Sequence, residues 1–129
     1  MGGFTRSRQA ATNPDELLQA YRRWAREHVE AKDPDVSTAA HTRLVEVTSA
    51  LRAQGAERRI LELLNDASAS VRYCAGYDAL YLAPEDGLRV LRALAAGPPS
   101  KARTGASMTL WVRERGFLVL YPWEREGQE

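Results

Sequence analysis

The side chains that could do chemistry form no recognisable catalytic or metal-binding pattern in this chain. Cys74 is the only cysteine, and it stands on a predicted buried helix with no histidine near it in sequence, so we expect an inert thiol. His28 and His41 fall on different predicted helices without metal-ligand spacing, which favours packed or capped rings. A glycine-rich phosphate loop and a serine nucleophile elbow are also missing from the sequence. We therefore predict no enzyme, no metal site and no cofactor.

The residues best suited to bind a partner are aromatic and basic. Three tyrosines follow one another at one-turn spacing on one predicted helix, and basic residues stand beside them and on a later helix. These candidate partner-binding residues are Arg72, Tyr73, Tyr77, Tyr81, Lys101 and Arg103. Tyr and Arg commonly anchor protein interfaces. The alternative is that the tyrosines wedge between adjacent helices with their hydroxyls in water.

Apolar residues that recur every three to four positions predict the helices that carry these side chains. The predicted spans are about 15–31, 35–53, 56–65 and 70–82, a fifth helix that Pro84 opens and Gly97 ends, and about 100–115. Asn13 or Thr12 supplies a cap, and Pro14 stands at the first helical position. Gly55 stands where a helix commonly ends in left-handed geometry.

An internal repeat relates the last four predicted helices. An offset of about 31 residues places the third and fourth helices on the fifth and sixth, and a two-helix period in this range is typical of an α-solenoid. The offset aligns Ile60 with Leu91, Leu63 with Leu94, Val71 with Ala102, Ala75 with Ala106 and Leu80 with Trp111. The sequence thus predicts an all-α protein, a short α-α solenoid of about six helices, with Trp111 in its core.

The first unit of this repeat resembles a HEAT repeat through residues 61–66, 71–72, 75 and 79–80. The resemblance implies HEAT-like helical hairpins, and a structural role for Val71 and for Asp66, whose carboxylate pairs with Arg72. That carboxylate can also accept from the free amides of the turn and so tie it down. The second unit departs from the pattern, because Gly97 occupies the place of Asp66 while Arg103 keeps that of Arg72.

A longer stretch, about 15–116, resembles the bacterial HEAT-like family called domain of unknown function two-thousand-and-nineteen. The residues that carry this resemblance are 15–18, 30–31, 51–55, 61–66, 71–72, 83–85 and 106–110. Most of them are structural. At the level of fold and context, some small HEAT-like bacterial proteins of this kind resemble immunity partners of secreted toxins.

Composition and charge narrow the classes of partner. The 18 basic and 17 acidic side chains are mixed along the chain and leave a net charge of +1, which speaks against a dedicated nucleic-acid binder. No stretch is apolar enough to cross a bilayer. No apolar region follows the basic residues near the N-terminus, so we expect a cytoplasmic protein rather than a secreted one.

We expect one HEAT-like helical domain over residues 12–116, preceded by a flexible tail over 1–11 and followed by an apolar segment and polar tail over 117–129. The apolar run 117–123 either covers the end of the solenoid or contributes to a homo-oligomer or partner interface. Our leading hypothesis is a non-enzymatic protein–protein interaction scaffold, in its most specific form an immunity protein that binds a cognate bacterial toxin. A HEAT-like nucleic-acid-binding module is the alternative.

Overall fold

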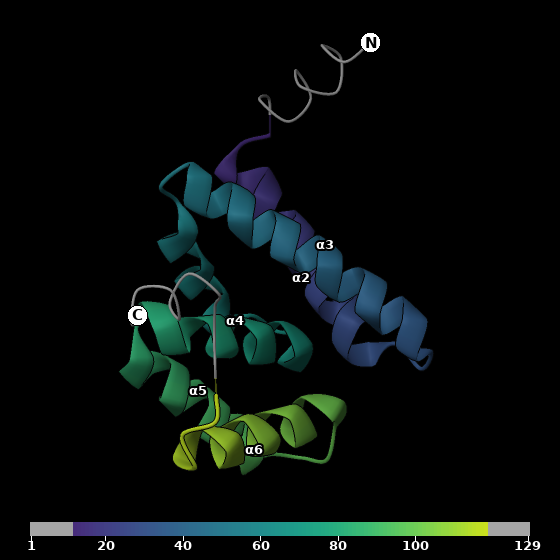
Figure 1. Cartoon of the computed structure of the whole chain (residues 1–129), viewed down its shortest axis with the longest axis vertical. Helices are drawn as coiled ribbons and strands as arrows, with labels where there is room; N and C mark the ends of the chain where they lie inside the picture. The colour runs from purple at the N-terminus through teal and green to yellow at the C-terminus, as the bar shows by residue number, and fades with distance from the viewer. Residues whose placement is uncertain (1–11, 119–129) are drawn as a thin grey trace. The chain divides into compact units, whose positions relative to one another are not determined.

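The computed structural model describes residues 12–118, and every regular element in this range is a helix (Figure 1). The elements are α2 (Pro14–Glu30), α3 (Pro34–Ala53), the 3₁₀ helix η1 (Glu57–Asn65), α4 (Ala69–Leu82), α5 (Pro84–Ala95) and α6 (Lys101–Glu114). Consecutive helices pack as hairpins, α2 with α3 and α4 with α5. The predicted fold class is confirmed, because helical hairpins of this kind are the units of a short α-solenoid. Within residues 12–118, no helix combines the length and the apolar character needed to span a membrane.

Local side-chain caps set the helix boundaries close to the predicted positions. The Asn13 side chain accepts a hydrogen bond from the Glu16 amide at 2.9 Å at the start of α2. Ser100 does the same for the Arg103 amide at 3.0 Å in α6. Gly55, after α3, has the left-handed φ of +71° that its position predicted. These contacts satisfy backbone groups that a helix end leaves without partners.

The third helix differs from the expectation in its type. The sequence predicted a short helix over about 56–65, and the structure has a 3₁₀ helix, Glu57–Asn65. Its buried residues include Ile60 and Leu63, which stand three positions apart. Because a 3₁₀ helix has three residues per turn, this spacing places both side chains on one face.

The contacts divide the chain into two compact units, one ending at Arg59 and the other beginning at Ile60, where the sequence predicted one domain over 12–116. In the first unit, α2 packs on α3. Tyr21 and Leu51 are completely buried in it. At the end of this unit, the guanidinium of Arg59 lies 2.7 Å from the carboxylate of Asp15.

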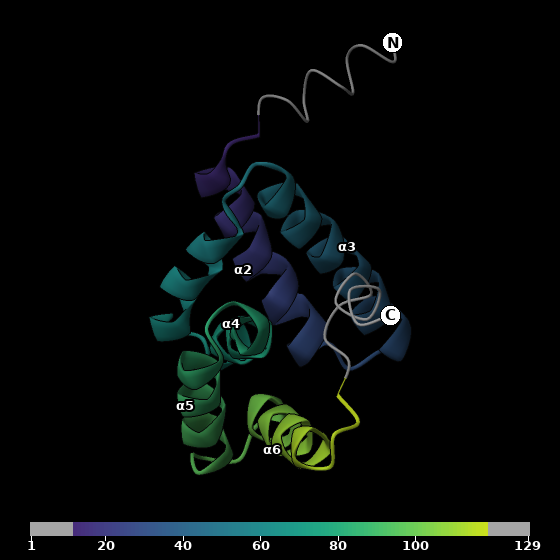
Figure 2. The same cartoon turned by 60° about the vertical axis from the view of Figure 1, so that its left-hand side comes forward.

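The second unit is built on a close approach of two helix backbones. A Cβ atom added to Gly87 in α5 would lie 2.8 Å from the Gly76 carbonyl oxygen and 2.8 Å from the Leu80 amide nitrogen, both in α4. The main chains of α4 and α5 therefore touch at this point. The last helix, α6, packs on both α5 and α4, and Figure 2 shows α5 and α6 beside the end-on α4.

One core prediction is wrong: Trp111 is 49% exposed. The other four aligned pairs of the repeat are buried in both members. In α6 the buried positions are Ala102, Ala106 and Thr109, which step by four and then three residues. Trp111 stands two residues beyond Thr109, about 200° further around the helix, so it faces away from the packed side.

The predicted flexible tail over residues 1–11 and most of the predicted C-terminal segment lie outside the described residues. Of that segment, the structure describes Phe117 and Leu118. Phe117 is exposed and Leu118 is half-buried.

Candidate partner-binding surface

The three candidate tyrosines of α4 differ in how far they are available to a partner. The Tyr73 ring packs on Gly105 of α6, where an added Cβ would lie 2.7 Å from the ring carbon Cζ. Its hydroxyl lies 3.4 Å from the Thr109 hydroxyl. Tyr77 is half-buried and Tyr81 is exposed. Tyr73 thus serves the contact between α4 and α6, as the wedge alternative described, and Tyr81 presents the most surface.

Burial also changes the acidity of the two inner tyrosines. Desolvation raises the pKa of Tyr73, although its contact with Thr109 opposes the shift. Desolvation is again the main cause at Tyr77, and repulsion from Tyr73 and Asp78 adds to it, so the pKa of Tyr77 is raised. Both phenols therefore remain protonated well above neutral pH.

Arg72 is committed to the turn between η1 and α4. Its Nη1 donates to the main-chain oxygens of Asp66 at 2.7 Å and Ala67 at 3.1 Å. The Asp66 carboxylate accepts a hydrogen bond from the Ser68 amide at 2.9 Å. Both residues stabilise the turn, but Arg72 binds the main-chain oxygen of Asp66, whereas the HEAT resemblance implied a pair with its carboxylate. Arg72 is half-buried as a result, whereas Lys101 and Arg103 are exposed near the start of α6.

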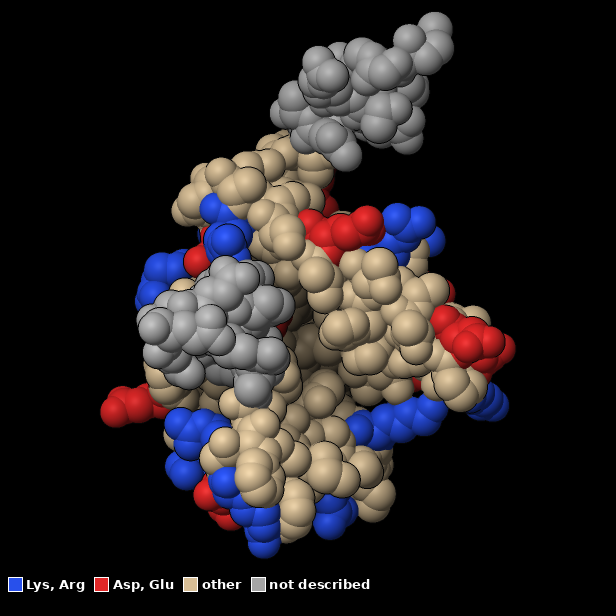
Figure 3. All heavy atoms as spheres, viewed as in Figure 1, with Lys and Arg blue, Asp and Glu red and all other residues tan. Residues whose placement is uncertain are grey.

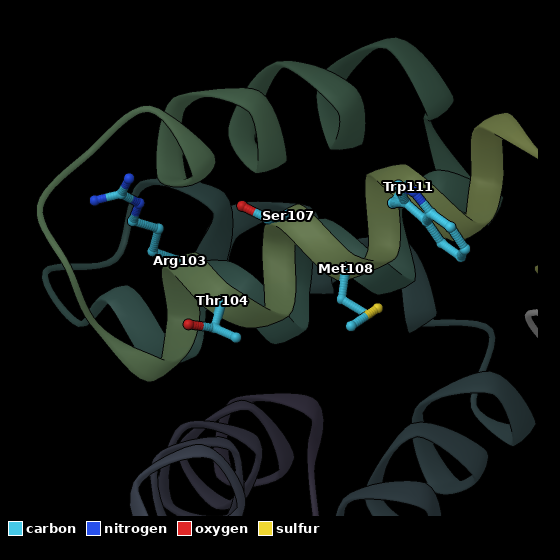
Figure 4. A pocket seen from close by; sticks show the side chains of 5 residues that line it. All are labelled: Arg103, Thr104, Ser107, Met108 and Trp111. Atoms are coloured by element: carbon cyan, nitrogen blue, oxygen red, sulfur yellow. The ribbon is translucent and has the colours of Figure 1, made fainter.

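The surface most suited to a partner lies on α6. We define the α6 face as Arg103, Thr104, Ser107, Met108 and Trp111, five exposed residues that border an open hollow of about 530 Å³. Figure 4 shows the five side chains along successive turns of this one helix. Met108 is 59% exposed, so two large side chains of the kind enriched at interfaces stand one turn apart in solvent.

Trp111 stacks with a basic residue. The guanidinium carbon of Arg115 lies 3.8 Å from the centre of the Trp111 ring, well within the range of a cation–π interaction. Arg115 also donates from Nη1 to the Trp111 main-chain oxygen at 3.3 Å. The stacked guanidinium restricts the rotamers of the indole, and a side chain that is restricted before binding loses less entropy when it binds.

The charge around the α6 face is basic. From its first residue to its C-cap, α6 carries four cations against one carboxylate, Glu114; the cations are Lys101, Arg103, Arg113 and Arg115. Figure 3 shows Lys and Arg side chains around the uncharged surface in the lower part of the view, where Figure 1 places α6. The local charge is therefore positive although the whole chain is nearly neutral.

A second hollow, of about 380 Å³, lies elsewhere in the second unit. Its walls come from the end of η1, the start of α4, α5 and the loop before α6. Apolar side chains such as Val90 and Leu94 line it, together with Arg72 and Arg89. The guanidinium of Arg89 lies 3.4 Å from the Asp86 carboxylate, and Arg72 is bound to the turn before α4. Both basic groups that line this hollow therefore already have partners.

Cys74 and the two histidines are packed side chains, as the sequence predicted, and the histidines pack on each other. Cys74 is buried, and desolvation, with a smaller contribution from Asp78, raises the pKa of its thiol. His28 and His41, which stand on different helices, lie with their ring centroids 5.0 Å apart in a tilted arrangement. Desolvation, followed by repulsion from His28, lowers the pKa of His41.

Sequence reasoning missed the exposure of Trp111 and the meeting of the histidines. The sequence did contain a signal for the exposure of Trp111. Arg115 follows it by four residues, the spacing that brings side chains together on an exposed helix face. The contact between the histidines depends on how α2 and α3 align across their turn, which no local sequence pattern encodes.

These features define the class of protein: an all-α chain of helical hairpins in which α6, the last helix within residues 12–118, presents a basic surface with an exposed tryptophan. No protein-family model matches the chain, and no curated protein or solved structure matches it either.

Proposed function

We propose that this chain is a non-enzymatic protein–protein interaction scaffold that binds another protein through the α6 face. The observation that carries the proposal is the half-exposed Trp111, which stacks with Arg115 and stands one turn from the exposed Met108. Trp, Met and Arg are enriched where protein interfaces are buried most deeply. The side chains are supported by a rigid helix, so a partner meets a preorganised surface.

The expected contribution of Trp111 follows from its exposure. Burying the exposed half of an indole removes about 100 Å² of mostly apolar surface from water, which stabilises a complex by about 2 kcal/mol. That energy corresponds to a change of about thirtyfold in Kd. Trp111→Ala should therefore weaken the complex by at least this order, since it also removes the platform for Arg115.

The test is affinity capture from the native lysate with tagged protein, read by quantitative mass spectrometry. The chain offers a matched control, because Val45 on α3 is also 49% exposed. A protein captured by the wild type and by Val45→Ala, but lost with Trp111→Ala, supports the proposal. A protein retained equally by all three variants would rule out the α6 face.

In its most specific form, the scaffold is an immunity protein that occludes a cognate bacterial toxin. This form rests on the resemblance to small HEAT-like bacterial proteins and on a surface able to cover a partner's site. We also propose a cytoplasmic location for this immunity protein. A chain with a single cysteine, which cannot form an internal disulfide, suits that reducing compartment. The test is growth: the captured protein should stop growth when expressed alone and allow it when the wild type is co-expressed. Continued growth arrest in the presence of the wild type would refute this form.

A HEAT-like nucleic-acid-binding module remains the second candidate, and the basic charge of α6 is what favours it. Nuclease treatment of the lysate separates the two functions, because capture that survives it does not depend on nucleic acid. Binding to a DNA duplex that falls steeply with added salt, and depends on Arg103 and Arg113, would support the second candidate.

A further inference from the structure

The two histidines of the first unit form a pair that the sequence did not predict. His28 stands near the end of α2, and His41 stands in α3 on the other side of the turn. Their ring centroids are 5.0 Å apart and their planes are inclined by 47°. The chain has only these two histidines, and the fold places them against each other.

A serine fixes the protonation pattern of the His28 ring. Nδ1 of His28 lies 3.0 Å from the Ser37 main-chain oxygen and 3.1 Å from the Ser37 hydroxyl oxygen. The hydroxyl itself donates to the His28 main-chain oxygen at 2.7 Å. Because a carbonyl oxygen only accepts, Nδ1 must carry a proton and donate it. The lone pair of the neutral ring is then on Nε2.

This arrangement is the one that metal-binding histidines commonly show. A ligating imidazole usually donates its other N–H to a carbonyl or carboxylate, which orients the ring and raises the basicity of the free nitrogen. The His41 ring makes no hydrogen bond within residues 12–118, and the residue is exposed. Each ring therefore has a nitrogen that makes no hydrogen bond within the described residues, although His28 is half-buried.

The spacing of the rings fits chelation of one ion. With a metal–nitrogen bond of about 2.0–2.1 Å, the metal lies about 3.2 Å from each ring centre. Two such rings have centroids about 4.5 Å apart at a right angle and about 5.2 Å apart at the tetrahedral angle. The observed 5.0 Å lies between these values.

We propose that His28 and His41 together bind one divalent transition-metal ion of the class that prefers imidazole: copper, nickel or zinc. Nε2 of His28 and one nitrogen of His41 supply two ligands, and water completes the coordination. No group of three or more His, Cys, Asp or Glu side chains in the described part of the chain is placed to hold a metal. The site is therefore an open one that joins α2 to α3.

The test is calorimetric titration of the full, untagged chain with Cu²⁺, Ni²⁺ and Zn²⁺ at pH 7.5. We expect one bound ion per chain and tighter binding of Cu²⁺ than of Ni²⁺ or Zn²⁺. His28→Ala and His41→Ala should each weaken Cu²⁺ binding at least tenfold. Thr42→Ala, an exposed neighbour of His41, is the matched control and should bind as the wild type does.

A second measurement keeps the proposal testable if a histidine variant folds poorly. Because the ligands come from two helices, Cu²⁺ should raise the melting temperature of the wild type and of Thr42→Ala. It should not raise that of His41→Gln, whose fold far-ultraviolet circular dichroism can check. The shared site would be refuted if all variants bound Cu²⁺ with equal affinity, or if only one of the two histidine substitutions weakened Cu²⁺ binding. The absence of binding at millimolar Cu²⁺ would also refute it.

Discussion

Gly87 is the position where a single added methyl group should most clearly destabilise this protein. The Cβ of an alanine there would lie 2.8 Å from the Gly76 oxygen and 2.8 Å from the Leu80 nitrogen. Both are main-chain atoms inside α4, so no side chain can turn aside to make room. Gly87→Ala therefore forces α4 and α5 apart by several tenths of an ångström.

Two effects of opposite sign set the change in the free energy of unfolding of Gly87→Ala. Overpacking a close contact typically costs about 1–3 kcal/mol, and a clash with backbone belongs in the upper part of that range. Alanine favours the helical conformation over glycine by about 1 kcal/mol. The net expectation is a loss of about 1–2 kcal/mol in the free energy of unfolding, or a fall in Tm of roughly 4–8 °C per kcal/mol for a unit of this size.

The assay is urea denaturation followed by circular dichroism, with the midpoint and the slope fitted separately. A lower midpoint at an unchanged slope reports a loss of stability in the native state. Gly97→Ala is the matched control, because its added Cβ would lie no closer than 3.4 Å to the Ala93 and Leu94 oxygens and its φ is not left-handed. Equal midpoints for the two alanine variants would refute the argument that the α4 and α5 backbones touch.

Two further predictions concern the titratable groups. Cys74 is buried and the pKa of its thiol is raised. A disulfide reagent at pH 8 should therefore label the native chain far more slowly than the urea-unfolded chain, as followed by absorbance. Equal labelling rates would contradict the burial of Cys74. The lowered pKa of His41 means that the unfolded chain binds more protons just below the ordinary histidine pKa of about 6.5. The free energy of unfolding should thus fall between pH 7.5 and 5.5 in metal-free buffer, and urea titrations should find a smaller fall in His41→Gln; an identical fall would count against the prediction.

The helices could be predicted because their signals are local. Asn13 before Pro14, and Gly55 after α3, act through hydrogen bonds and dihedral angles of adjacent residues, so a sequence pattern contains the whole cause. The burial of Cys74 followed from the same helix periodicity. These features need no knowledge of which helix packs against which.

The site could be predicted only in part, because it depends on helix rotation. The repeat alignment treats α6 as a copy of α4, and this assumption fails at Trp111, where the buried position is Thr109 instead. In the same way, Tyr73 was placed among the binding residues because nothing in its own helix shows that Gly105 leaves room for its ring. Tertiary contacts decide these cases, and they lie outside any window of adjacent residues.

The contact between Tyr73 and Gly105 also limits how this sequence can diverge over evolutionary time. Any side chain at position 105 would enter the volume of the ring, so a larger residue there requires the ring to shift or a smaller residue to replace it. The two positions are therefore expected to vary together more often than positions on the exposed faces. A bulky ring in one helix, matched to a glycine in the helix that packs against it, is thus a covariation signature by which distant relatives of this chain can be recognised.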